Sequence, residues 1–228
     1  MALVLDIETA GYDFKSLSES MQEFLLRYAE KEKDADLRNE KIEDAKRYLS
    51  LYPLTAKVIV IGMLNTKTGN SIVLFEGDGK EGWDVPDKHI KYISCSEEVL
   101  LARFWQYVQK VPTVITFNGR NFDIPFLMIR SALLNIKPSR NFITNRYHID
   151  NHIDLLDQFT FYGITKKFNL DFYCQSFGIT SPKSKGITGM DVKDLYNAGR
   201  IKDIAIYCGD DVIATYNLYK IWNEYLNI

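Results

Sequence analysis

The sequence predicts an α/β fold in which helices flank a mixed β-sheet. Three observations predict it: apolar runs rich in β-branched residues mark strands, segments with helical periodicity follow them, and the later strands and helices alternate along the chain. The 228 residues are 46% hydrophobic. A chain of this length and composition can bury one sizeable core, so we expect a single domain over residues 1–228.

The individual elements follow from these patterns. Strands are expected at Leu3–Ile7, Val58–Leu64, Ser71–Phe75 and Val111–Phe117. The second and third strands are joined by TKTGN, whose glycine and asparagine are typical of a hairpin turn. Helices are expected at about Glu97–Gln109, Ile124–Leu134 and Ile201–Leu226. Ser94 and Glu97 have the spacing of a capping box at the start of the first of these helices.

A charged insertion follows the first strand, at about residues 16–50. It holds 7 basic and 9 acidic side chains. Its apolar residues recur at spacings of three and four, which predicts two short amphipathic helices. These residues are Met21, Phe24, Leu25, Tyr28, Ile42, Ala45 and Leu49. The insertion either caps the core as a solvated excursion or forms a lid or wall beside a site on the first strand.

Charge is distributed unevenly along the chain. The whole sequence has 28 basic and 30 acidic residues, a net charge of −2, which argues against a globally basic nucleic-acid coat protein. Residues 130–202, however, hold 11 basic and 6 acidic side chains. This positive stretch suits an anionic polymer lying across part of the surface, or it is ordinary surface variation.

The three cysteines, Cys95, Cys174 and Cys208, are far apart and have no metal-ligand spacing. They predict buried thiols in a reducing compartment and argue against a disulfide framework. No segment approaches the roughly 18 apolar residues of a membrane-spanning helix, and no basic leader precedes an apolar stretch. We therefore expect a soluble, cytoplasmic protein.

Asp6 and Glu8 are two residues apart in an apolar strand, so their side chains project from the same face of the sheet. Burying two like charges side by side is costly unless a cation neutralises them. The pair therefore indicates a metal or a basic partner. A strand end at which both carboxylates reach water would explain it as well.

A third acidic residue, Asp123, ends the string FNGRNFD, which follows the apolar strand VPTVITF. Asn118 and Gly119 turn the chain at the carboxyl end of that strand, where α/β sheets place their ligands. Asp123 also precedes a helix with Pro125 near its start. It is therefore either a ligand-binding residue or the cap of that helix.

The last helix carries the most informative carboxylate. Seven of its residues recur at steps of three and four and form one continuous stripe. They are Ile204, Cys208, Asp211, Thr215, Leu218, Trp222 and Leu226. Asp211 thus occupies a position on the buried face, with Tyr207 one turn earlier on that face and Asp210 toward the polar side. A buried carboxylate must be satisfied, by a metal or by a buried arginine.

Together these motifs resemble the tyrosine-bearing (DEDDy) branch of the DEDD exonuclease superfamily, whose fold is RNase H-like. DIET at Asp6–Thr9 matches the first family motif, NGRNFD at Asn118–Asp123 the second, and YCGDD, with Tyr207 and Asp211, the third. The histidine-bearing branch requires a histidine where Ile206 stands. The strings HIDLLDQFTFYG, LDFYCQSFGI and GRIKDIAIYCGDDVIATYNLY resemble stand-alone relatives of family-B DNA polymerase proofreading domains. The resemblance covers the chain except the charged insertion.

This resemblance implies a metal-dependent 3′-5′ exonuclease that hydrolyses nucleic acid to nucleoside monophosphates. Its metal ligands would be Asp6, Glu8, Asp123 and Asp211, with Asp6 bridging two ions. Hard oxygen ligands select Mg²⁺ or Mn²⁺, and two such ions can clamp the attacking and leaving oxygens at phosphorus. Tyr207 would orient the nucleophilic water, because a phenol with a pKa of about 10 is a poor base at neutral pH.

Family members hold the terminal nucleotide with the backbone around the first motif and an aromatic residue in the second. The resemblance therefore implicates Ile7, Thr9, Asn118 and Phe122 in substrate binding. Phe122 would stack on a base, or else belong to the core of the following helix. Lys183 and Lys185, in the loop SPKSKGITG, form either a phosphate-binding edge or an ordinary charged loop.

The expected substrate is the 3′ end of single-stranded DNA, with a polymerase or repair partner in trans. One alternative is an exoribonuclease that trims RNA 3′ ends, since the same four acids serve RNA in other branches. Another is a catalytically silent nucleic-acid-binding accessory module, although such modules usually lose a metal ligand and all five motif residues are present here. A third is a partner-binding protein that uses the charged insertion.

Overall fold

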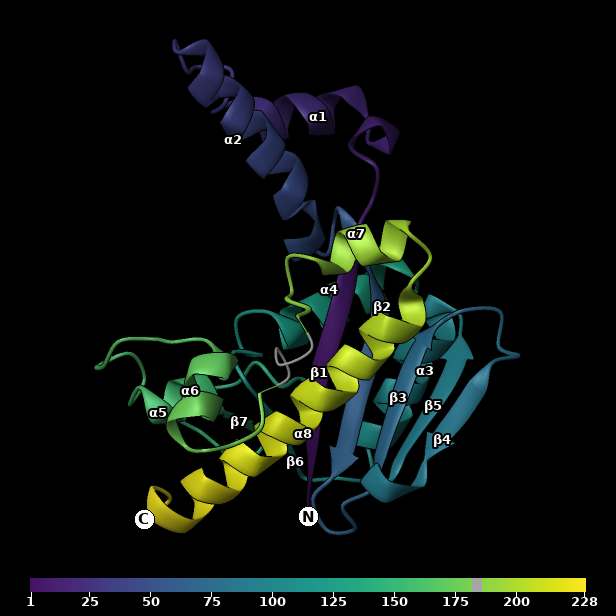
Figure 1. The fold of residues 1–228 in the computed structure, drawn as a ribbon, viewed down its shortest axis with the longest axis vertical. Coiled ribbons are helices and arrows are strands. Elements are labelled where there is room, and N and C mark those ends of the chain that lie inside the picture. The colour runs from purple at the N-terminus through teal and green to yellow at the C-terminus, as the bar shows by residue number, and fades with distance from the viewer. Residues whose placement is uncertain (182–185) are drawn as a thin grey trace.

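The computed structural model describes residues 1–181 and 186–228, and the described chain forms a seven-stranded sheet with helices on both faces (Figure 1). The strand order is β4-β5-β3-β2-β1-β6-β7. The strands are β1 (Ala2–Gly11), β2 (Ala56–Asn65), β3 (Ser71–Glu76), β4 (Gly82–Val85), β5 (Ile90–Cys95), β6 (Thr113–Thr116) and β7 (His152–Asp154). The pairs β1–β2, β2–β3 and β4–β5 are antiparallel, whereas β1–β6, β3–β5 and β6–β7 are parallel. The predicted mixed α/β sheet is therefore confirmed.

Helices α3 and α4 cover one face of this sheet, and the long helix α8 crosses the other (Figure 1). The helices are α1 (Glu19–Leu26), α2 (Ala35–Arg47), α3 (Glu97–Val108), α4 (Asp123–Leu133), α5 (Leu155–Phe159), α6 (Leu170–Ser176), α7 (Val192–Asn197) and α8 (Ile201–Tyr225), with 3-10 turns η1 (Phe14–Ser16), η2 (Tyr48–Leu51) and η3 (Pro86–Lys88). One apolar core lies between the sheet and α3 and α4, and two smaller clusters lie under α8. The three helices predicted from periodicity are thus confirmed within a residue or two at each end.

Strand β1 is central, with β2 on one side and β6 on the other. Because both its faces are covered, it is a nearly continuous apolar run, as central strands of covered sheets are. Leu3, Leu5 and Ile7 pack in the core under α3 and α4. The alternate residues face α8, and Asp6 and Glu8 are among them. The fold therefore places two carboxylates in the layer between the sheet and α8.

Helix α8 lies close to the sheet because two glycines leave room for it. A Cβ added to Gly62 on β2 would lie 2.7 Å from Cγ2 of Val212 and 2.9 Å from Sγ of Cys208. A Cβ on Gly209 in α8 would lie 2.7 Å from the hydroxyl oxygen of Tyr92 on β5. Gly62 is also the partner of Asp6 in the β1–β2 register. The close approach of α8 is therefore made beside the acidic residues of β1.

The capping box predicted for Ser94 and Glu97 is wrong. Helix α3 begins at Glu97, and its N-cap is Ser96. The buried Glu97 carboxylate instead accepts hydrogen bonds from the Val58 N–H (2.8 Å) and from Arg130, with Nη2–Oε2 at 2.7 Å and Nε–Oε1 at 2.9 Å. A carboxylate withdrawn from water needs charged or polar partners, and these long-range partners outweigh a local cap.

The strand predictions are incomplete. Strands β4, β5 and β7 have no counterpart among the strands predicted from the sequence, and β6 is shorter than the predicted Val111–Phe117. The predicted hairpin between β2 and β3 is confirmed. Its turn closes with hydrogen bonds from Gly69 N–H to Asn65 O (2.8 Å) and from Asn65 N–H to Asn70 O (3.0 Å). Gly69 has a positive φ of 73°, which a residue without a side chain adopts at little cost.

The charged insertion forms two helices, α1 and α2, as its apolar spacing predicts. No residue of these two fully described helices is buried, and both stand away from the sheet (Figure 1). Phe24 is 64% exposed and Tyr28 is 67% exposed. Only the following turn, η2, packs on β1, where Leu49 is fully buried and the Ser50 carbonyl accepts a hydrogen bond from the Thr9 hydroxyl (2.6 Å). The two helices therefore do not cap the core.

Candidate active site

Strand β1 and helix α8 bring three of the four predicted acids together. Carboxylate oxygens of Asp6, Glu8 and Asp211 all lie within 4.8 Å of one another. Asp211 is 8% exposed and lies on the buried stripe of α8, as its position among apolar residues predicts. Oxygen ligands in a group of this size can hold a hard divalent cation such as Mg²⁺ or Mn²⁺.

The fourth acid, Asp123, is the first residue of α4 and lies beside this group. It is 4% exposed, and its Oδ1 accepts a hydrogen bond from the Ile7 N–H (3.1 Å), between the two acids of β1. The alternative that Asp123 only caps the helix is wrong, because the N-cap of α4 is Phe122 and the Asp123 side chain binds β1. The bond to β1 fixes the start of α4 against the strand that carries Asp6 and Glu8.

Burial and mutual repulsion act on all of these carboxyls. Burial, and then the nearby charges led by Asp211, raise the pKa of Asp6 well above its ordinary value. The same causes raise the pKa of Glu8. Burial, opposed by backbone hydrogen bonds, raises the pKa of Asp123 to about 7. A cation among these groups would remove both the desolvation and the repulsion that oppose their ionisation.

The described residues around Asp6 and Glu8 provide these two carboxylates with no cationic partner. Within residues 1–181 and 186–228, no lysine or arginine forms an ion pair with either side chain. The Cys208 thiol contacts Asp6, with its Sγ 3.3 Å from Oδ2 of that residue. A thiol is a weak donor and carries no charge when protonated. The carboxylate oxygens of this group thus fit a cation, because no described basic side chain balances the negative charge of Asp6 and Glu8.

Tyr207 lies one helical turn before Asp211 and is 8% exposed. Burial, and then the charges of Asp211, Glu8 and Asp6, raise the pKa of Tyr207 far above its ordinary value, and its hydroxyl is hydrogen-bonded to Asp211. The phenol is therefore protonated at every physiological pH. It can donate a hydrogen bond and orient a neighbour, but it cannot act as a general base.

A pocket of about 230 Å³ opens beside these residues. It is lined by Asp6, Phe117, Asn169, Leu170, Asp171, Gly189, Tyr207 and Asp211. Phe117 precedes the second motif and was not among the predicted site residues. The pocket joins the acidic group to the start of α6, so a molecule held by the acids would also touch an apolar and a polar wall.

The two predicted contacts in the first motif already have internal partners. Ile7 is 3% exposed and belongs to the core under α3 and α4, and its N–H binds Asp123. Thr9 is 5% exposed, and its hydroxyl donates to the Ser50 carbonyl. The side chains of Ile7 and Thr9 and the Ile7 N–H are therefore all engaged within the protein.

The second motif is divided between the loop and the core. Asn118 has a positive φ of 65° and donates its N–H to Oδ1 of Asp154 (2.9 Å). Phe122 packs against the core under α3 and α4, with its ring centroid 5.5 Å from that of Phe126. The remaining predicted contacts, Lys183 and Lys185, lie outside the described residues.

Asp154 is a positioning residue that carries no role in the sequence prediction. It ends β7 and is 2% exposed. Its Oδ1 accepts from the N–H groups of Asn118 (2.9 Å) and Leu156 (3.0 Å), and its Oδ2 accepts from the N–H of Arg120 (2.9 Å). One buried carboxylate thus fixes the turn that leads to Asp123. Its signal in the sequence is an acid in the middle of the apolar run HIDLLD.

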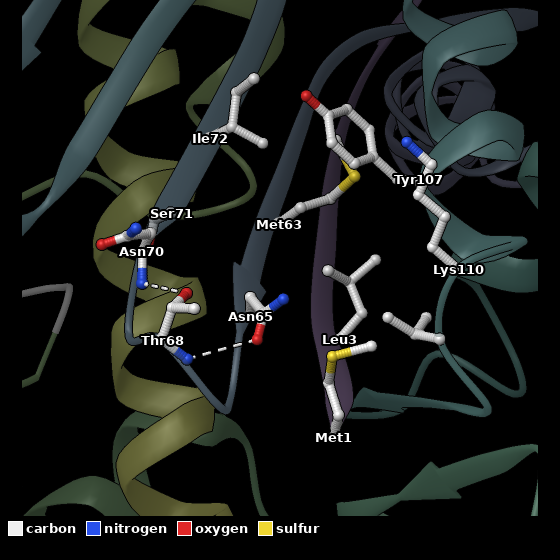
Figure 2. A pocket seen from close by; sticks show the side chains of 11 residues that line it. Met1, Leu3, Met63, Asn65, Thr68, Asn70, Ser71, Ile72, Tyr107 and Lys110 are labelled. Atoms are coloured by element: carbon white, nitrogen blue, oxygen red, sulfur yellow. Dashed lines mark hydrogen bonds between the residues drawn. The ribbon is translucent and has the colours of Figure 1, made fainter.

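A separate cavity of about 430 Å³ lies at the other end of the sheet, between the β2–β3 hairpin and the end of α3 (Figure 2). Leu3 and Met63 form part of its apolar floor, and Asn65, Tyr107 and Lys110 stand at its edge (Figure 2). None of the described residues that line it is a carboxylate. It shares no described lining residue with the pocket beside Asp6 and lies apart from the acidic site.

Two further sequence expectations concern the chain as a whole. All three cysteines are free and buried, as predicted. Among the helices of the described residues, none is long and apolar enough to cross a membrane.

The chain resembles segments of archaeal DNA polymerases. It is 44% identical over 43 residues to DNA polymerase 1 of Sulfolobus acidocaldarius, covering 19% of this chain and 5% of that protein. It is 33% identical over 89 residues to DNA polymerase 1 of Sulfurisphaera ohwakuensis, covering 33% of this chain and 10% of that protein. The chain thus spans a tenth or less of these relatives.

The fold is found within a larger enzyme of known structure. The family B DNA polymerase of Pyrobaculum calidifontis matches with a TM-score of 0.61 at 18% identity, covering 97% of this chain and 24% of that one. This likeness confirms the RNase H-like fold expected of polymerase-type exonuclease domains. A family model described as a predicted 3′-5′ exonuclease related to the exonuclease domain of PolB matches residues 56–225, well over half of the chain. The chain belongs to this family.

Proposed function

We propose that this chain is a divalent-metal-dependent 3′-5′ exonuclease that removes nucleoside monophosphates from single-stranded DNA. The observation that carries the proposal is the convergence of Asp6, Glu8 and Asp211, with Asp123 beside them, in one buried and acidic layer. These acids come from three distant segments of a chain that belongs to an exonuclease family. Since its relatives are DNA polymerases, a polymerase acting in trans is the partner we propose.

The acids divide naturally between two ions. Asp6, Glu8 and Asp211 would hold one Mg²⁺ or Mn²⁺, and Asp6 with Asp123 would hold a second. When bound, such ions lower the pKa of a water and neutralise charge on a phosphodiester. Asp123 is tied to the Ile7 N–H, so it presents a fixed carboxylate to this layer.

Tyr207 and Phe117 would act on the substrate side of the acids. The Tyr207 phenol keeps its proton and donates a hydrogen bond to Asp211, so its oxygen can accept a hydrogen bond from a water and orient that water but cannot remove a proton. Phe117 and Leu170 give the pocket an apolar wall that a nucleoside could cover. Covering this wall would exclude water from the acids and strengthen each electrostatic interaction there.

The position of the pocket favours a single strand. The pocket, of about 230 Å³, lies directly against Asp6, Tyr207 and Asp211, so we expect a paired end to fray before its terminal phosphodiester reaches Asp6. Melting the last pairs costs a few kcal/mol. We therefore expect single strands to be degraded faster than blunt duplexes.

The test is digestion of matched 5′-labelled single-stranded DNA and RNA with Mg²⁺ or Mn²⁺, in the wild type and in two variants of neighbouring residues. Asp211→Asn removes a carboxylate of the acidic group, whereas Asp210→Asn alters a side chain paired with Lys88. We expect a ladder shortening from the 3′ end that is abolished by EDTA and by Asp211→Asn and retained in Asp210→Asn. Near-full activity of a clean Asp211→Asn preparation would end the proposal. Faster digestion of RNA would favour the exoribonuclease, and binding without digestion the accessory module.

A further inference from the structure

A surface of aromatic and basic side chains lies next to the active-site pocket, at the start of α6. We name it the α6 surface, and it consists of Lys166, Lys167, Phe168 and Phe172. The rings of Phe168 and Phe172 are stacked, with centroids 4.2 Å apart and an angle of 11° between the planes. Phe172 is nevertheless 51% exposed, so one side of the stack is open to solvent.

The α6 surface is continuous with the pocket that contains Asp6. Asn169, Leu170 and Asp171, which lie between the two phenylalanines in sequence, line that pocket. Contacts between aromatic rings also connect the α6 surface with the pocket. Phe117 in the pocket wall contacts Tyr173 (5.7 Å between centroids), and Tyr173 contacts Phe168 (6.3 Å). A strand whose end occupies the pocket therefore has a direct path across this surface.

The stack is held in place by the backbone around it. The Asn169 side chain caps α6 and accepts a hydrogen bond from the Phe172 N–H (2.9 Å). The Asp171 carboxylate accepts hydrogen bonds from Gln175 and from the Ser181 hydroxyl. Phe172 is thus an exposed ring on a fixed support, which lowers the entropy lost when a second ring packs on it.

The α6 surface is positively charged, and its two lysines have no carboxylate partner among the described residues. Lys166 and Lys167 are exposed, and no described carboxylate forms an ion pair with either. Lys166 Nζ lies 5.2 Å from the centroid of the Phe168 ring. Exposed aromatic rings beside free lysines match a polymer that alternates flat bases with phosphates.

We propose that the α6 surface holds the nucleotides upstream of the one being removed, with a base stacked on Phe172 and phosphates beside Lys166 and Lys167. The inference rests on the proposed exonuclease function. It adds a second contact region, which recognises the single-stranded form of a nucleic acid without reading its sequence, because every base has a flat face. It also predicts that affinity depends on strand length, since a very short strand fills the pocket and does not reach Phe172.

The test measures the affinity of fluorescent oligothymidylates of about three and about ten nucleotides, a range that spans one binding region. Binding is followed by anisotropy in the full chain with EDTA, so that no strand is cut. We expect Phe172→Ala to weaken binding of the longer strand roughly tenfold and to leave the shorter one unchanged. Phe172→Trp should restore affinity and Phe172→Leu should not, because leucine packs on Phe168 but offers no ring to a base. Tyr225→Ala, which removes an exposed ring at the end of α8, is the matched control.

The phosphate contacts are tested with salt. Replacing Lys166 and Lys167 by Ala should reduce the salt dependence of binding by up to about two phosphate contacts. Lys80→Ala, at a side chain that is 83% exposed, should not change it. A single abasic site can also be moved along the longer strand. When it replaces the base that stacks on Phe172, wild type and Phe172→Ala should bind the strand with equal affinity.

Each outcome separates this inference from the exonuclease proposal. Equal affinity of wild type and Phe172→Ala for the longer strand overturns the α6 surface, even if digestion proceeds normally. Full rescue by Phe172→Leu also overturns it, since that result indicates an apolar protein contact. Length-dependent binding through Phe172 in a chain that digests nothing supports the surface and removes the exonuclease proposal.

Discussion

Both faces of the sheet bury charged side chains, and the two groups differ in how their charge is balanced. Under α3 and α4, Glu97 and Arg130 form a two-point ion pair with Nη2–Oε2 at 2.7 Å, and Val58 donates a further hydrogen bond to the same carboxylate. Under α8, Asp6 and Glu8 lie among other acids, with no described basic side chain paired to them.

This difference distinguishes a structural carboxylate, which is paired within the fold, from carboxylates that a bound cation could neutralise. For Glu97, a buried acid whose partners are structural, the fold provides a buried arginine. On the other face the neighbours of Asp6 are more acids, and burial and repulsion raise the pKa of the group. The protein thus accepts a less stable ionised state at one place, which is typical of a functional site.

The largest effect on stability is expected from breaking the balanced group. Arg130→Met leaves Glu97, which is 8% exposed, without its cation. Removing one partner of a buried pair costs about 3–5 kcal/mol. We expect a loss of this size in the free energy of unfolding, measured with urea at neutral pH. Arg200→Met is the control, because the Arg200–Asp203 pair is exposed and such pairs contribute about 1 kcal/mol or less. Equal losses in the two variants would contradict the comparison.

The second effect is a dependence of stability on pH in the metal-free protein. The pKa of Asp123 rises from 3.8 to about 7 on folding, so between these values the folded protein binds more protons than the unfolded chain. Its contribution to stability therefore falls as the pH rises through this interval, by about 4 kcal/mol at most. The measurement is urea unfolding in EDTA between acidic and neutral pH. Asp123→Asn should reduce this fall but not abolish it, because the raised pKa values of Asp6 and Glu8 contribute with the same sign.

His152 acts in the opposite direction and must be separated from it. Burial lowers the pKa of His152 from 6.5 to about 3, so its contribution to stability is present above pH 6.5 and is lost as the pH falls. The difference between wild type and Asp123→Asn cancels this contribution. Added Mg²⁺ should abolish the fall due to Asp123 and leave the His152 effect intact. A fall that persists with Mg²⁺ would show that no cation enters the acidic group.

The sequence predicts those parts of the site that depend on local periodicity. Alternation along β1 places Asp6 and Glu8 on one face, and the stripe of α8 places Asp211 and Tyr207 on the buried side. Both expectations concern side chains within one element. They hold because a regular strand or helix fixes the direction of each side chain.

The parts that depend on distant partners could not be predicted in this way. Glu97 has the spacing of a capping box, but its partners Val58 and Arg130 lie far away in sequence. Strand β4 is an edge strand of four residues and β7 has three, too short for a periodic signal. The roles of Asp154 and Phe117 also depend on segments that meet only in the fold.

The third prediction concerns the contact that joins α8 to the sheet. A Cβ at position 62 would lie 2.7 Å from Cγ2 of Val212 and 2.9 Å from Sγ of Cys208, so Gly62→Ala forces a shift at the contact between α8 and β2. We expect a loss of about 1–3 kcal/mol in the free energy of unfolding, the usual cost of overpacking. Mn²⁺ affinity, measured by calorimetry, should fall as Asp211 moves away from Asp6. Adding Val212→Ala should restore part of the free energy of unfolding and part of the Mn²⁺ affinity. If neither is restored, the effect of Gly62→Ala does not come from its contact with Val212.

The smallest effect on stability is expected from Tyr207→Phe, which sharpens the comparison because it changes no charge. The variant loses only a hydroxyl whose partner is Asp211, so the free energy of unfolding should change by about 1 kcal/mol or less, and Mn²⁺ affinity should be kept. The rate of strand digestion should nevertheless fall by roughly 10- to 10³-fold, on the scale of losing one positioning hydrogen bond. The shape of its pH profile should not change, because a phenol whose pKa is raised this far does not titrate in the working range.

Tyr219→Phe is the matched control for that experiment, since Tyr219 lies on the same helix and its hydroxyl contacts only the exposed Asn223 among the described residues. It should digest at the wild-type rate. An unchanged rate in Tyr207→Phe would remove this tyrosine from the mechanism and leave the carboxylates alone to act. A changed pH profile would instead show that the phenol gives up its proton. Tyr207 would then carry a negative charge in addition to the four carboxylates on this face of the sheet.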